Sequence, residues 1–536
     1  MLTRRRTPSL FVAPLLVAAS VAATGCNPHP IKPVEATPVL EDGKGLPLDV
    51  NKKVDVLLVI DNSGSMGEEQ ANLAANFGPF IEKLEDAGAD YRIGITTTDL
   101  GGTNCQTGTG GELHLGSCLD RPETFEFAGD DQYDVACAAQ CEYGDAELTI
   151  RPTPLTADGE ASARPWIESF NGVDNLPEAI GVLDAFQCFA PQGISGCGWE
   201  SPLEAMARAL TNMQDPTQPE YGFLRHDALL AVLIVTDEVD CSFGVGMEGA
   251  LFEAETFWAE TANFATSAVC WNAGVACSGD SPYEDCWDVN LDAQGQETSD
   301  PAQMVLRPVS RYVEQLEAVA ATKQAGREVL VSVIAGVPAG YSEGEAEQVF
   351  ADSDDPEFQR DFGIGAGCAN EVEGVVQTAI PPVRLETFAS AFMAPSLGDK
   401  GRNLYSVCEA DYTPAILDIV AGIELELPPA CFPACVLDVD SSTEALDYSC
   451  DVLEEVGGEE RELVECALVG ETHELPAGED ACWIAKTGAD LAAECVASKR
   501  NLEFELLRRP GVSVPGDVQV LAVCELSSSP SLDCGA

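Results

Sequence analysis

The chain has 536 residues, 45 % of them hydrophobic, with 28 Lys and Arg against 90 Asp and Glu, a formal net charge of −62. This hydrophobic content suffices for a buried core in two or three domains and excludes disorder over the whole length. The negative charge would repel a phosphate backbone, so we expect no binding to nucleic acid. Twenty-one Cys predict disulfides in an oxidising compartment, and only 4 His leave few candidates for acid–base chemistry or a His-rich metal site.

The N-terminus has the pattern of an exported protein. Three Arg at 4–6 precede an apolar run from Leu10 to Ala23, which predicts a signal peptide over residues 1–25. The run ends in Ala23-Thr24-Gly25-Cys26, which resembles the lipobox of bacterial lipoproteins. That resemblance implies that Cys26 is acylated and becomes the first mature residue, leaving an even number of Cys. The alternative is a secreted protein in which Cys26 forms a disulfide.

Residues 26–50 contain five Pro and no hydrophobic periodicity, so we expect an extended tether. The longest later apolar run, Ala228 to Val235, has the length of a buried strand and is too short to cross a bilayer. A lipid at Cys26 would therefore be the only membrane attachment, which predicts a lipid-anchored protein of the bacterial cell envelope, at the outer membrane or cell surface.

From residue 51 to about 425 the pattern alternates between strands and amphipathic helices. Near-continuous apolar runs predict strands buried on both faces, and apolar residues at helical spacing predict helices between them. The predicted elements are, in chain order, a strand at 54–60, a helix at 73–84, a strand at 91–97, a helix at 203–210, strands at 228–236 and 329–334 around a helix at 312–319, and a helix from 413 to 423. The expected fold class is α/β, Rossmann-like, with a mainly parallel sheet and helices on both faces.

Oxygen-bearing side chains follow the first of these strands. Asp61, Ser63 and Ser65 leave the strand at 54–60 at positions i, i+2 and i+4, and Asp237 follows the strand at 228–236. Ligands of parallel sheets bind at the carboxyl ends of the strands, and hard divalent cations prefer oxygen ligands. The pattern therefore predicts a cation site formed by these side chains.

The Asp-x-Ser-x-Ser pattern behind a buried strand resembles the von Willebrand factor type A family and its metal-ion-dependent adhesion site. The resemblance implies that Asp61, Ser63, Ser65, Ser201 and Asp237 hold Mg²⁺, or Mn²⁺ or Ca²⁺, with one coordination position open to a carboxylate of a protein ligand. Ser201, followed by Pro202 and Glu204, is alternatively a helix cap. Glu238 and Asp240 compete with Asp237, and Asp99 after the second strand is read as a solvated turn residue.

The excess length of this region over a minimal domain of the family is assigned to insertions near residues 100–165, 241–305 and 340–400, which contain many of the Cys. Cys188 and Cys197 flank a short Gly-containing segment just before Ser201. We expect these two Cys to form a disulfide that stiffens the metal-side edge of the sheet.

Residues 426–536 are expected to form a small Cys-rich domain that contains β-strands. Strands are predicted at 502–507 and 518–526, joined by a turn at Pro515-Gly516. Cys431-x-x-x-Cys435 is read as disulfide-forming rather than zinc-binding, because no His lies near and exported thiols are oxidised. Three acids at 438, 440 and 447 are read as a solvated face rather than a calcium loop.

These features favour a lipid-anchored binding protein that uses the divalent-metal site for adhesion or protein–protein interaction. The sequence has no Gly-x-Ser-x-Gly, no His-Glu-x-x-His and no phosphate-binding loop, so we do not expect the protein to be an enzyme. The alternatives are a structural envelope protein whose metal only stabilises the fold, and an extracellular hydrolase in the insertions.

Overall fold

The computed structural model describes residues 45–48, 52–101, 110–155, 159–323, 329–372, 375–393, 402–425, 429–443, 445–456, 459–470, 472–509, 512 and 518–534. The predicted signal peptide (1–25), the lipidation site Cys26 and the predicted turn at Pro515-Gly516 lie outside these residues. Within the described ranges no helix has the length and apolar character needed to cross a membrane.

The first sheet has seven strands in the order β14-β11-β8-β2-β3-β6-β7. Its centre is β2, whose every residue is buried because helices cover both faces of the sheet. The pairs β2–β3, β2–β8, β8–β11 and β11–β14 are parallel, whereas β6 and β7 continue the sheet in antiparallel pairing. The strands are β2 (Lys53–Ile60), β3 (Asp90–Thr97), β6 (Ile167–Phe170), β7 (Val173–Asp174), β8 (Leu229–Val235), β11 (Val329–Ala335) and β14 (Leu404–Ser406).

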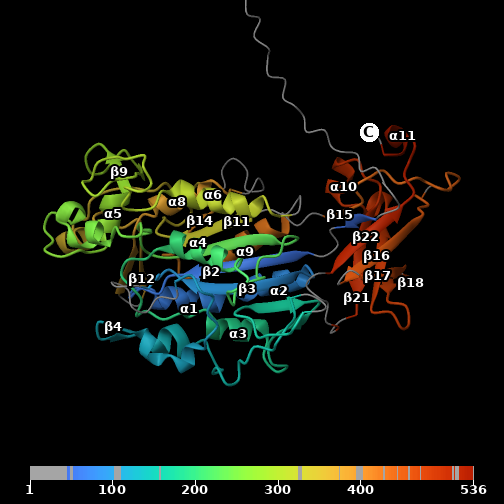
Figure 1. Ribbon diagram of the computed structural model, residues 1–536, viewed down its shortest axis with the longest axis horizontal. Coiled ribbons are helices and arrows are strands. Elements are labelled where there is room, and N and C mark those ends of the chain that lie inside the picture. Colours follow the sequence, from blue (N-terminus) through green and yellow to red (C-terminus); the bar gives the residue numbers. More distant parts are fainter. Residues whose placement is uncertain are drawn as a thin grey trace, which may run out of the picture. The chain divides into compact units, whose positions relative to one another are not determined.

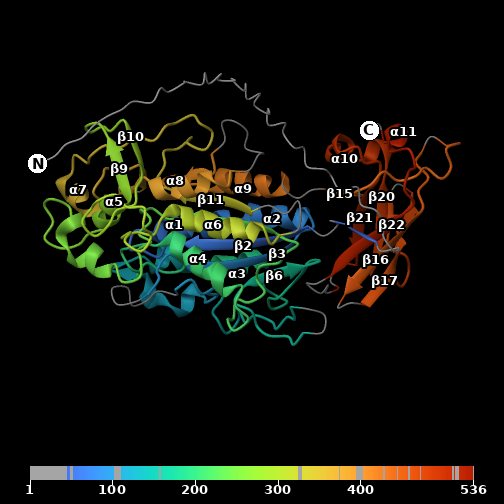
Figure 2. The same ribbon diagram turned by 45° about the horizontal axis from the view of Figure 1, so that its top comes forward.

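Alternating side chains of β2 enter two separate cores, as the two-residue period of a strand requires. Val56 and Leu58 pack with residues of α1, α2, α3 and α9, while Leu57 and Val59 pack with residues of α4, α6 and α8. Figures 1 and 2 show these helices around the central strands. These helices are α1 (Gly67–Asn76), α2 (Gly78–Asp86), α3 (Val182–Phe189), α4 (Pro202–Asn212), α6 (Val309–Ala320), α8 (Val383–Ser390) and α9 (Thr413–Leu425).

The single helix expected over residues 73–84 is two helices. The first, α1, ends at Asn76, and α2 begins at Gly78 with Pro79 in its first turn. Pro has no N–H to continue the hydrogen-bond ladder of a preceding helix, and it is well placed in the first turn of a new one. The apolar spacing continued across this break, which is why periodicity alone did not reveal it.

The segments between these elements are short helices and two-stranded ribbons held by disulfides, which confirms the disulfide prediction. Bridges join Cys118–Cys137, Cys141–Cys188, Cys241–Cys270, Cys277–Cys286 and Cys368–Cys408. The ribbons and small helices are β4 (Glu126–Phe127), β5 (Asp130–Asp131), α5 (Ala268–Gly274), β9 (Val275–Ser278), β10 (Asp285–Asp288), α7 (Pro356–Phe362), β12 (Cys368–Val372) and β13 (Val375–Ala379).

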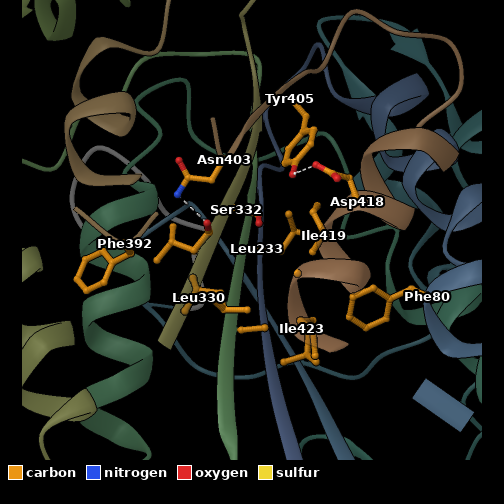
Figure 3. A pocket seen from close by; sticks show the side chains of 15 residues that line it. Phe80, Leu233, Leu330, Ser332, Phe392, Asn403, Tyr405, Asp418, Ile419 and Ile423 are labelled. Carbon is orange, nitrogen blue, oxygen red and sulfur yellow. Dashed lines mark hydrogen bonds between the residues drawn. The ribbon is translucent and has the colours of Figure 1, made fainter. Parts of the chain in front are cut away.

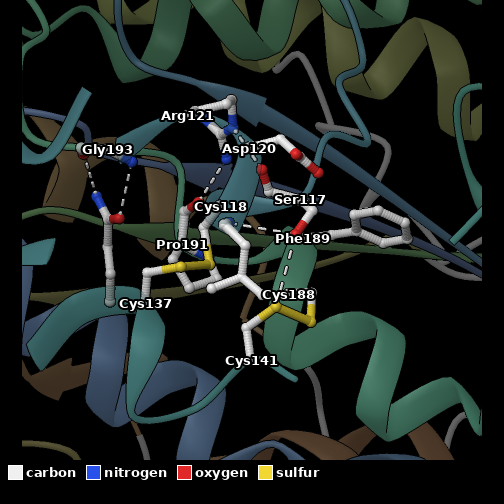
Figure 4. The surroundings of a disulfide bond; sticks show 12 residues. Ser117, Cys118, Asp120, Arg121, Cys137, Cys141, Cys188, Phe189, Pro191 and Gly193 are labelled. Atoms are coloured by element: carbon white, nitrogen blue, oxygen red, sulfur yellow. Dashed lines mark hydrogen bonds between the residues drawn. A yellow bond between two sulfur atoms is a disulfide. The ribbon is translucent and has the colours of Figure 1, made fainter. Parts of the chain in front are cut away.

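The predicted Cys188–Cys197 bridge is wrong. Cys188 lies on the buried face of α3 and is bonded to Cys141, with 4.6 Å between their Cα atoms (Figure 4). Cys197 is disulfide-bonded elsewhere, and its N–H donates to Asp99 at 3.1 Å. Nine residues of spacing would allow the bridge, but the orientation of Cys188 into the core excludes it.

The second sheet also has seven strands, in the order β1-β22-β16-β17-β20-β21-β15, and most of its pairs are antiparallel. Disulfides join Cys431–Cys495, Cys435–Cys534, Cys450–Cys524 and Cys466–Cys482, so the disulfide reading of Cys431 and Cys435 is confirmed. The elements are β1 (Leu46–Leu48), β15 (Ala430–Cys431), β16 (Cys450–Val456), β17 (Glu459–Glu465), β18 (Ala467–Val469), β19 (Thr472–Glu474), β20 (Ala481–Lys486), α10 (Ala493–Ala497), β21 (Glu503–Arg508), β22 (Gln519–Cys524) and α11 (Pro530–Asp533).

Two predictions about organisation need correction. Residues 46–48 belong to β1, which pairs with β22, so the expected tether of residues 26–50 contains a strand of the second sheet. The fold class, a mainly parallel Rossmann-like sheet, is wrong for the chain: among the strand pairs of the described residues, eleven are antiparallel and five are parallel. The antiparallel pairs come from four two-stranded sheets, from β6 and β7 at one edge of the first sheet and from most of the second sheet, and few of these strands have the continuous buried apolar run of β2 and β8.

Candidate metal site

The candidate site begins where β2 and β8 end side by side. Ile60 is in register with Val235, and the N–H of Asp61 donates to the carbonyl of Val235 at 2.9 Å. The two strands therefore deliver Asp61 and Asp237 to the same edge of the sheet. Between Asp61 and the start of α1 at Gly67, the chain makes the turn that contains Ser63 and Ser65.

Asp61 is fully buried and held from three sides. One carboxylate oxygen accepts hydrogen bonds from the N–H of Ser63 at 2.8 Å and from Thr98 Oγ1 at 3.4 Å, and the other accepts from Thr236 Oγ1. Gln70 of α1 fixes the same loop, because its Nε2 donates to the carbonyl of Asp61 at 2.7 Å. The side chain is therefore oriented before any ligand binds.

The two Ser of the motif lie at different depths. Ser63 is buried and Ser65 is exposed, and their hydroxyl oxygens are 3.4 Å apart. The motif therefore places two hydroxyls next to each other, one within the protein and one at the surface, beside the buried carboxylate of Asp61.

The three acids after β8 have different surroundings. Asp240 forms an ion pair with Arg384 at 3.0 Å and accepts from the N–H of Leu203 at the start of α4, so it is occupied. Asp237 is 5 % exposed, and its Oδ1 has no hydrogen-bond partner within the described residues. Glu238 lies beside it and is partly exposed. Asp237 and Glu238 are therefore the acids that remain for a ligand.

Ser201 makes no hydrogen bond to these acids within the described residues, and its side chain does not cap α4. Its hydroxyl donates to the carbonyl of Cys241 at 2.8 Å, and it makes no side-chain cap to the helix. The capping alternative is wrong because Asp240 and Ser242 bind the first N–H groups of α4 instead. The residue before it, Glu200, is the one whose carboxylate lies near Glu238 and Asp61.

Five carboxylates thus gather at this edge, from Asp61, Glu69, Glu200, Asp237 and Glu238, and we call them the carboxylate cluster. Four of the five are at most 5 % exposed. Within the described part of the chain, no Lys, Arg or His forms an ion pair with any of them. Buried acids are ordinarily paired with a cation or a metal ion, so this cluster is a candidate cation site.

The electrostatics reflect that crowding. Burial, followed by repulsion from the neighbouring acids, raises the pKa of Glu69 to about 7, and burial with the charge of Asp61 raises the pKa of Glu238 to about 7. Burial also raises the pKa of Asp237 and Glu200 well above the ordinary range, with neighbouring carboxylates as the next cause. Each group prefers to be neutral here unless positive charge enters.

The cluster opens into a pocket of about 480 Å³. Ser65, Glu69, Asp237 and Glu238 line it together with Glu68 of α1, residues of β5 and of the segment after it, one residue of α7, and residues of β13 and Ile380. The segment directly after β13 is bonded to the site, because the N–H of Ile380 donates to the carbonyl of Asp237 at 2.7 Å. The cluster is therefore reachable from solvent through Ser65 and its neighbours.

The oxygen donors at this edge are of the chemical kind that a hard divalent cation prefers. One carboxylate oxygen in each of Asp237, Glu69 and Glu200 is buried without a hydrogen-bond partner among the described residues, and such an atom calls for an explanation such as a bound ion. Carboxylates and hydroxyls are the oxygen donors that Mg²⁺, Mn²⁺ and Ca²⁺ accept. A cation bound there would also remove the repulsion within the carboxylate cluster.

Two other sequence predictions concern acids outside the carboxylate cluster. Asp99 is 1 % exposed and accepts from the N–H of Gly101 and of Cys197, so it is a buried loop anchor and not a solvated turn residue. Among the described residues no three His, Cys, Asp or Glu side chains are arranged to hold one metal ion, and this applies to the carboxylate cluster as well as to the acids at 438, 440 and 447. A cation at the cluster would therefore take hydroxyl or water oxygens as further ligands.

A second cavity, between β8, β11 and α9, offers no comparable chemistry. It is lined mainly by apolar side chains, with Tyr405 donating to Asp418 at 2.7 Å at its upper end (Figure 3). Its volume of about 30 Å³ has room for one or two water molecules.

Sequence reasoning missed Glu69 and Glu200 as members of the cluster. Glu69 lies in the first turn of α1, where acids are common because they favour the helix N-terminus, so its sequence carries no separate signal. Glu200 precedes the Ser on which the family pattern was placed. Only the arrangement of the loops in space brings these two side chains to Asp61.

No protein-family model matches the sequence, and neither does any curated protein. Among solved structures, the pilus adhesin SpaC from Lactobacillus rhamnosus GG in its open conformation aligns with 10 % identity over 90 % of this chain and 40 % of that chain, with a TM-score of 0.26. The pilus adhesin RrgA from Streptococcus pneumoniae aligns with 9 % identity over 89 % of this chain and 57 % of that chain, with a TM-score of 0.17. The chain thus spans less than two thirds of these adhesins, and scores this low establish neither a shared fold nor a shared function.

Proposed function

We propose that this protein binds a divalent cation at the carboxylate cluster and uses the cation to bind a protein ligand through a carboxylate of that ligand. Mg²⁺ is the first candidate, with Mn²⁺ and Ca²⁺ as alternatives. The observation that carries the proposal is the buried, unpartnered oxygen of Asp237 among four further carboxylates. The motif of Asp61, Ser63 and Ser65, which resembles the metal-ion-dependent adhesion site, supports it.

The biological role that we propose is adhesion or protein–protein interaction at the bacterial cell envelope. The predicted lipid at Cys26 would anchor the chain, and the numerous disulfides suit an oxidising exterior. The exposed hydroxyl of Ser65 at the pocket supports a cation that can reach a partner. A cation with a purely structural role is the competing function, because most of the cluster is buried.

The decisive experiment is thermal melting of the full chain, disulfides intact, with Mg²⁺, Mn²⁺ or Ca²⁺ and with EDTA, for wild type and Asp237→Asn. Asn keeps the volume and breaks no hydrogen bond at Oδ1, since that atom has none. We expect a cation-dependent rise in Tm for wild type, corresponding to about 2.7 kcal/mol at a hundredfold excess over Kd. The rise should vanish in Asp237→Asn, while this variant in EDTA is at least as stable as wild type.

The matched control is Asp86→Asn, which removes the same charge from an exposed position of α2 and should keep the full cation response. An equal rise for wild type and Asp237→Asn would contradict the assigned site. A rise without any cation-dependent binding of carboxylate-bearing peptides would favour the structural role.

A further inference from the structure

The mouth of the pocket carries acids beyond those that a cation needs. Glu68 of α1 and Asp130 and Asp131 of β5 line the same pocket as Asp237 and Glu69, and we call these three the rim carboxylates. We propose that the rim carboxylates bind a Lys or Arg side chain of the partner, next to the carboxylate that reaches the cation. This inference rests on the proposed function and adds the chemistry of the partner: a protein segment with adjacent acidic and basic residues.

The β4–β5 hairpin that carries two of these acids is attached to the metal motif. Gln132, directly after β5, donates from its Nε2 to the carbonyl of Gly64 at 3.5 Å and to Asp130 Oδ2 at 2.9 Å. The ring of Phe127 in the same hairpin lies against Gly64, where a Cβ would come within 2.3 Å of it. The motif loop and the rim carboxylates are therefore held in one arrangement, and Gly64 allows the close approach.

The third acid of the rim is positioned from the other side. Glu68 Oε2 accepts from Gln377 Nε2 of β13 at 2.6 Å. The β4–β5 hairpin and α1 thus bring acids to the pocket from segments that lie far apart in the sequence, and Gln377 of β13 holds one of these acids in place.

Two inner side chains point to a ligand independently of the rim. Glu69 and Asp237 are each 5 % exposed, line the pocket and have a carboxylate oxygen without a hydrogen-bond partner in the described part of the chain. A single divalent cation neutralises two of the negative charges around this pocket. The charge that remains favours a positively charged group as the neighbour of the cation.

The lining suits a long basic side chain in particular. None of the described lining residues is Lys, Arg or His, so no side chain of the described lining neutralises the rim carboxylates. Val135 and Val376 lie in the same lining and are 49 % and 61 % exposed. Lys and Arg place an apolar stem on such surfaces while their charged end reaches a carboxylate. The two exposed Val can contact the apolar stem of such a side chain, and the rim carboxylates can bind its charged end.

The test is selection of random heptapeptides displayed on phage against the immobilised full chain, at about 0.15 M salt, in Mg²⁺ and in EDTA. The variants are Asp130→Asn/Asp131→Asn, whose amide oxygen can still accept the hydrogen bond that Asp131 receives from the N–H of Tyr133. The matched control is Glu459→Gln/Glu460→Gln, which removes two charges from exposed positions of β17.

We expect the wild type and the control to enrich peptides in which Lys or Arg adjoins Asp or Glu, in Mg²⁺ only. The Asn variant should lose the Lys and Arg enrichment, keep the requirement for Mg²⁺, and bind the best peptide at least tenfold more weakly by fluorescence anisotropy. Its Tm rise in Mg²⁺ should equal that of wild type.

Each of the other possible results shows which hypothesis is wrong, the subsite for Lys or Arg or the cation-dependent function. Mg²⁺-dependent peptides with acids but no excess of Lys or Arg overturn the cationic subsite and leave the proposed function standing. Lys- and Arg-rich peptides enriched equally in EDTA support the subsite and contradict the cation-dependent function. A Tm rise lost in the Asn variant means that the rim holds the cation itself, which overturns the subsite, and no enrichment at all overturns both ideas.

Discussion

Replacing Glu69 with Gln should flatten the dependence of the unfolding free energy on pH in the absence of a divalent cation. Burial raises the pKa of Glu69 from 4.5 to about 7 in the folded protein. Between these two values the folded state holds a proton that the unfolded state has lost, so stability falls as the pH rises from 4.5 to 7 and is constant above it.

The magnitude follows from the size of that shift. At 1.36 kcal/mol for each pKa unit, the difference corresponds to about 3 kcal/mol for this one carboxyl group. Glu69→Gln removes the contribution of this one carboxyl group to the pH dependence. At pH 8 the variant in EDTA should therefore be more stable than wild type by up to that amount. Near pH 4 the two proteins should be equally stable.

The assay is urea-induced unfolding of both proteins in EDTA at pH 4, 5.5, 7 and 8, with disulfides intact. The control is Glu82→Gln on α2, where the carboxylate is exposed and its replacement should leave the pH profile of wild type unchanged. Equal pH profiles for wild type and Glu69→Gln would refute the reasoning, because they would mean that Glu69 is not held in a crowded, desolvated cluster.

Three further outcomes are expected. In wild type the rise in Tm caused by Mg²⁺ should be larger at pH 8 than at pH 5, because protons compete with the cation for the same carboxylates, and scanning calorimetry at both pH values measures this. Asp55→Ala should lower the unfolding free energy by about 3–5 kcal/mol in urea titrations, since it leaves the buried guanidinium of Arg225, 2.8 Å from Asp55, without its partner. Replacing Cys435 and Cys534 together with Ser should cost about 3–4 kcal/mol, measured by denaturation followed in the second sheet, because the Cys450–Cys524 bridge already shortens the loop of 99 residues that this disulfide closes.

Part of the candidate site was predictable because its signals are local. The buried strand of β2 and the spacing of Asp61, Ser63 and Ser65 lie within thirteen residues of one another, and the carboxyl end of a strand is where such side chains act. The placement of Asp237 followed from the strength of the apolar run before it. Glu69 and Glu200 carry no such signal, because each is also an ordinary acid at the start of a helix.

Asp55 illustrates a second limit of local patterns. It lies in the middle of the apolar run of β2 and yet is fully buried, because Arg225 donates to it from 170 positions away and Lys323 lies 3.7 Å from its other oxygen. The apolar run predicted the strand correctly. The buried charge of Asp55 requires positively charged partners, and these come from distant parts of the chain that the local sequence does not reveal.

The sequence by itself determined the positions of the central strands, the motif behind β2 and the presence of a disulfide-bonded, strongly acidic protein, since these depend on neighbouring residues and on composition. Only the tertiary structure decided the strand pairing, the partner of Cys188 and the membership of the carboxylate cluster. Those features depend on contacts between residues that are distant in the chain, and periodicity reports which face of an element is buried but not what covers it.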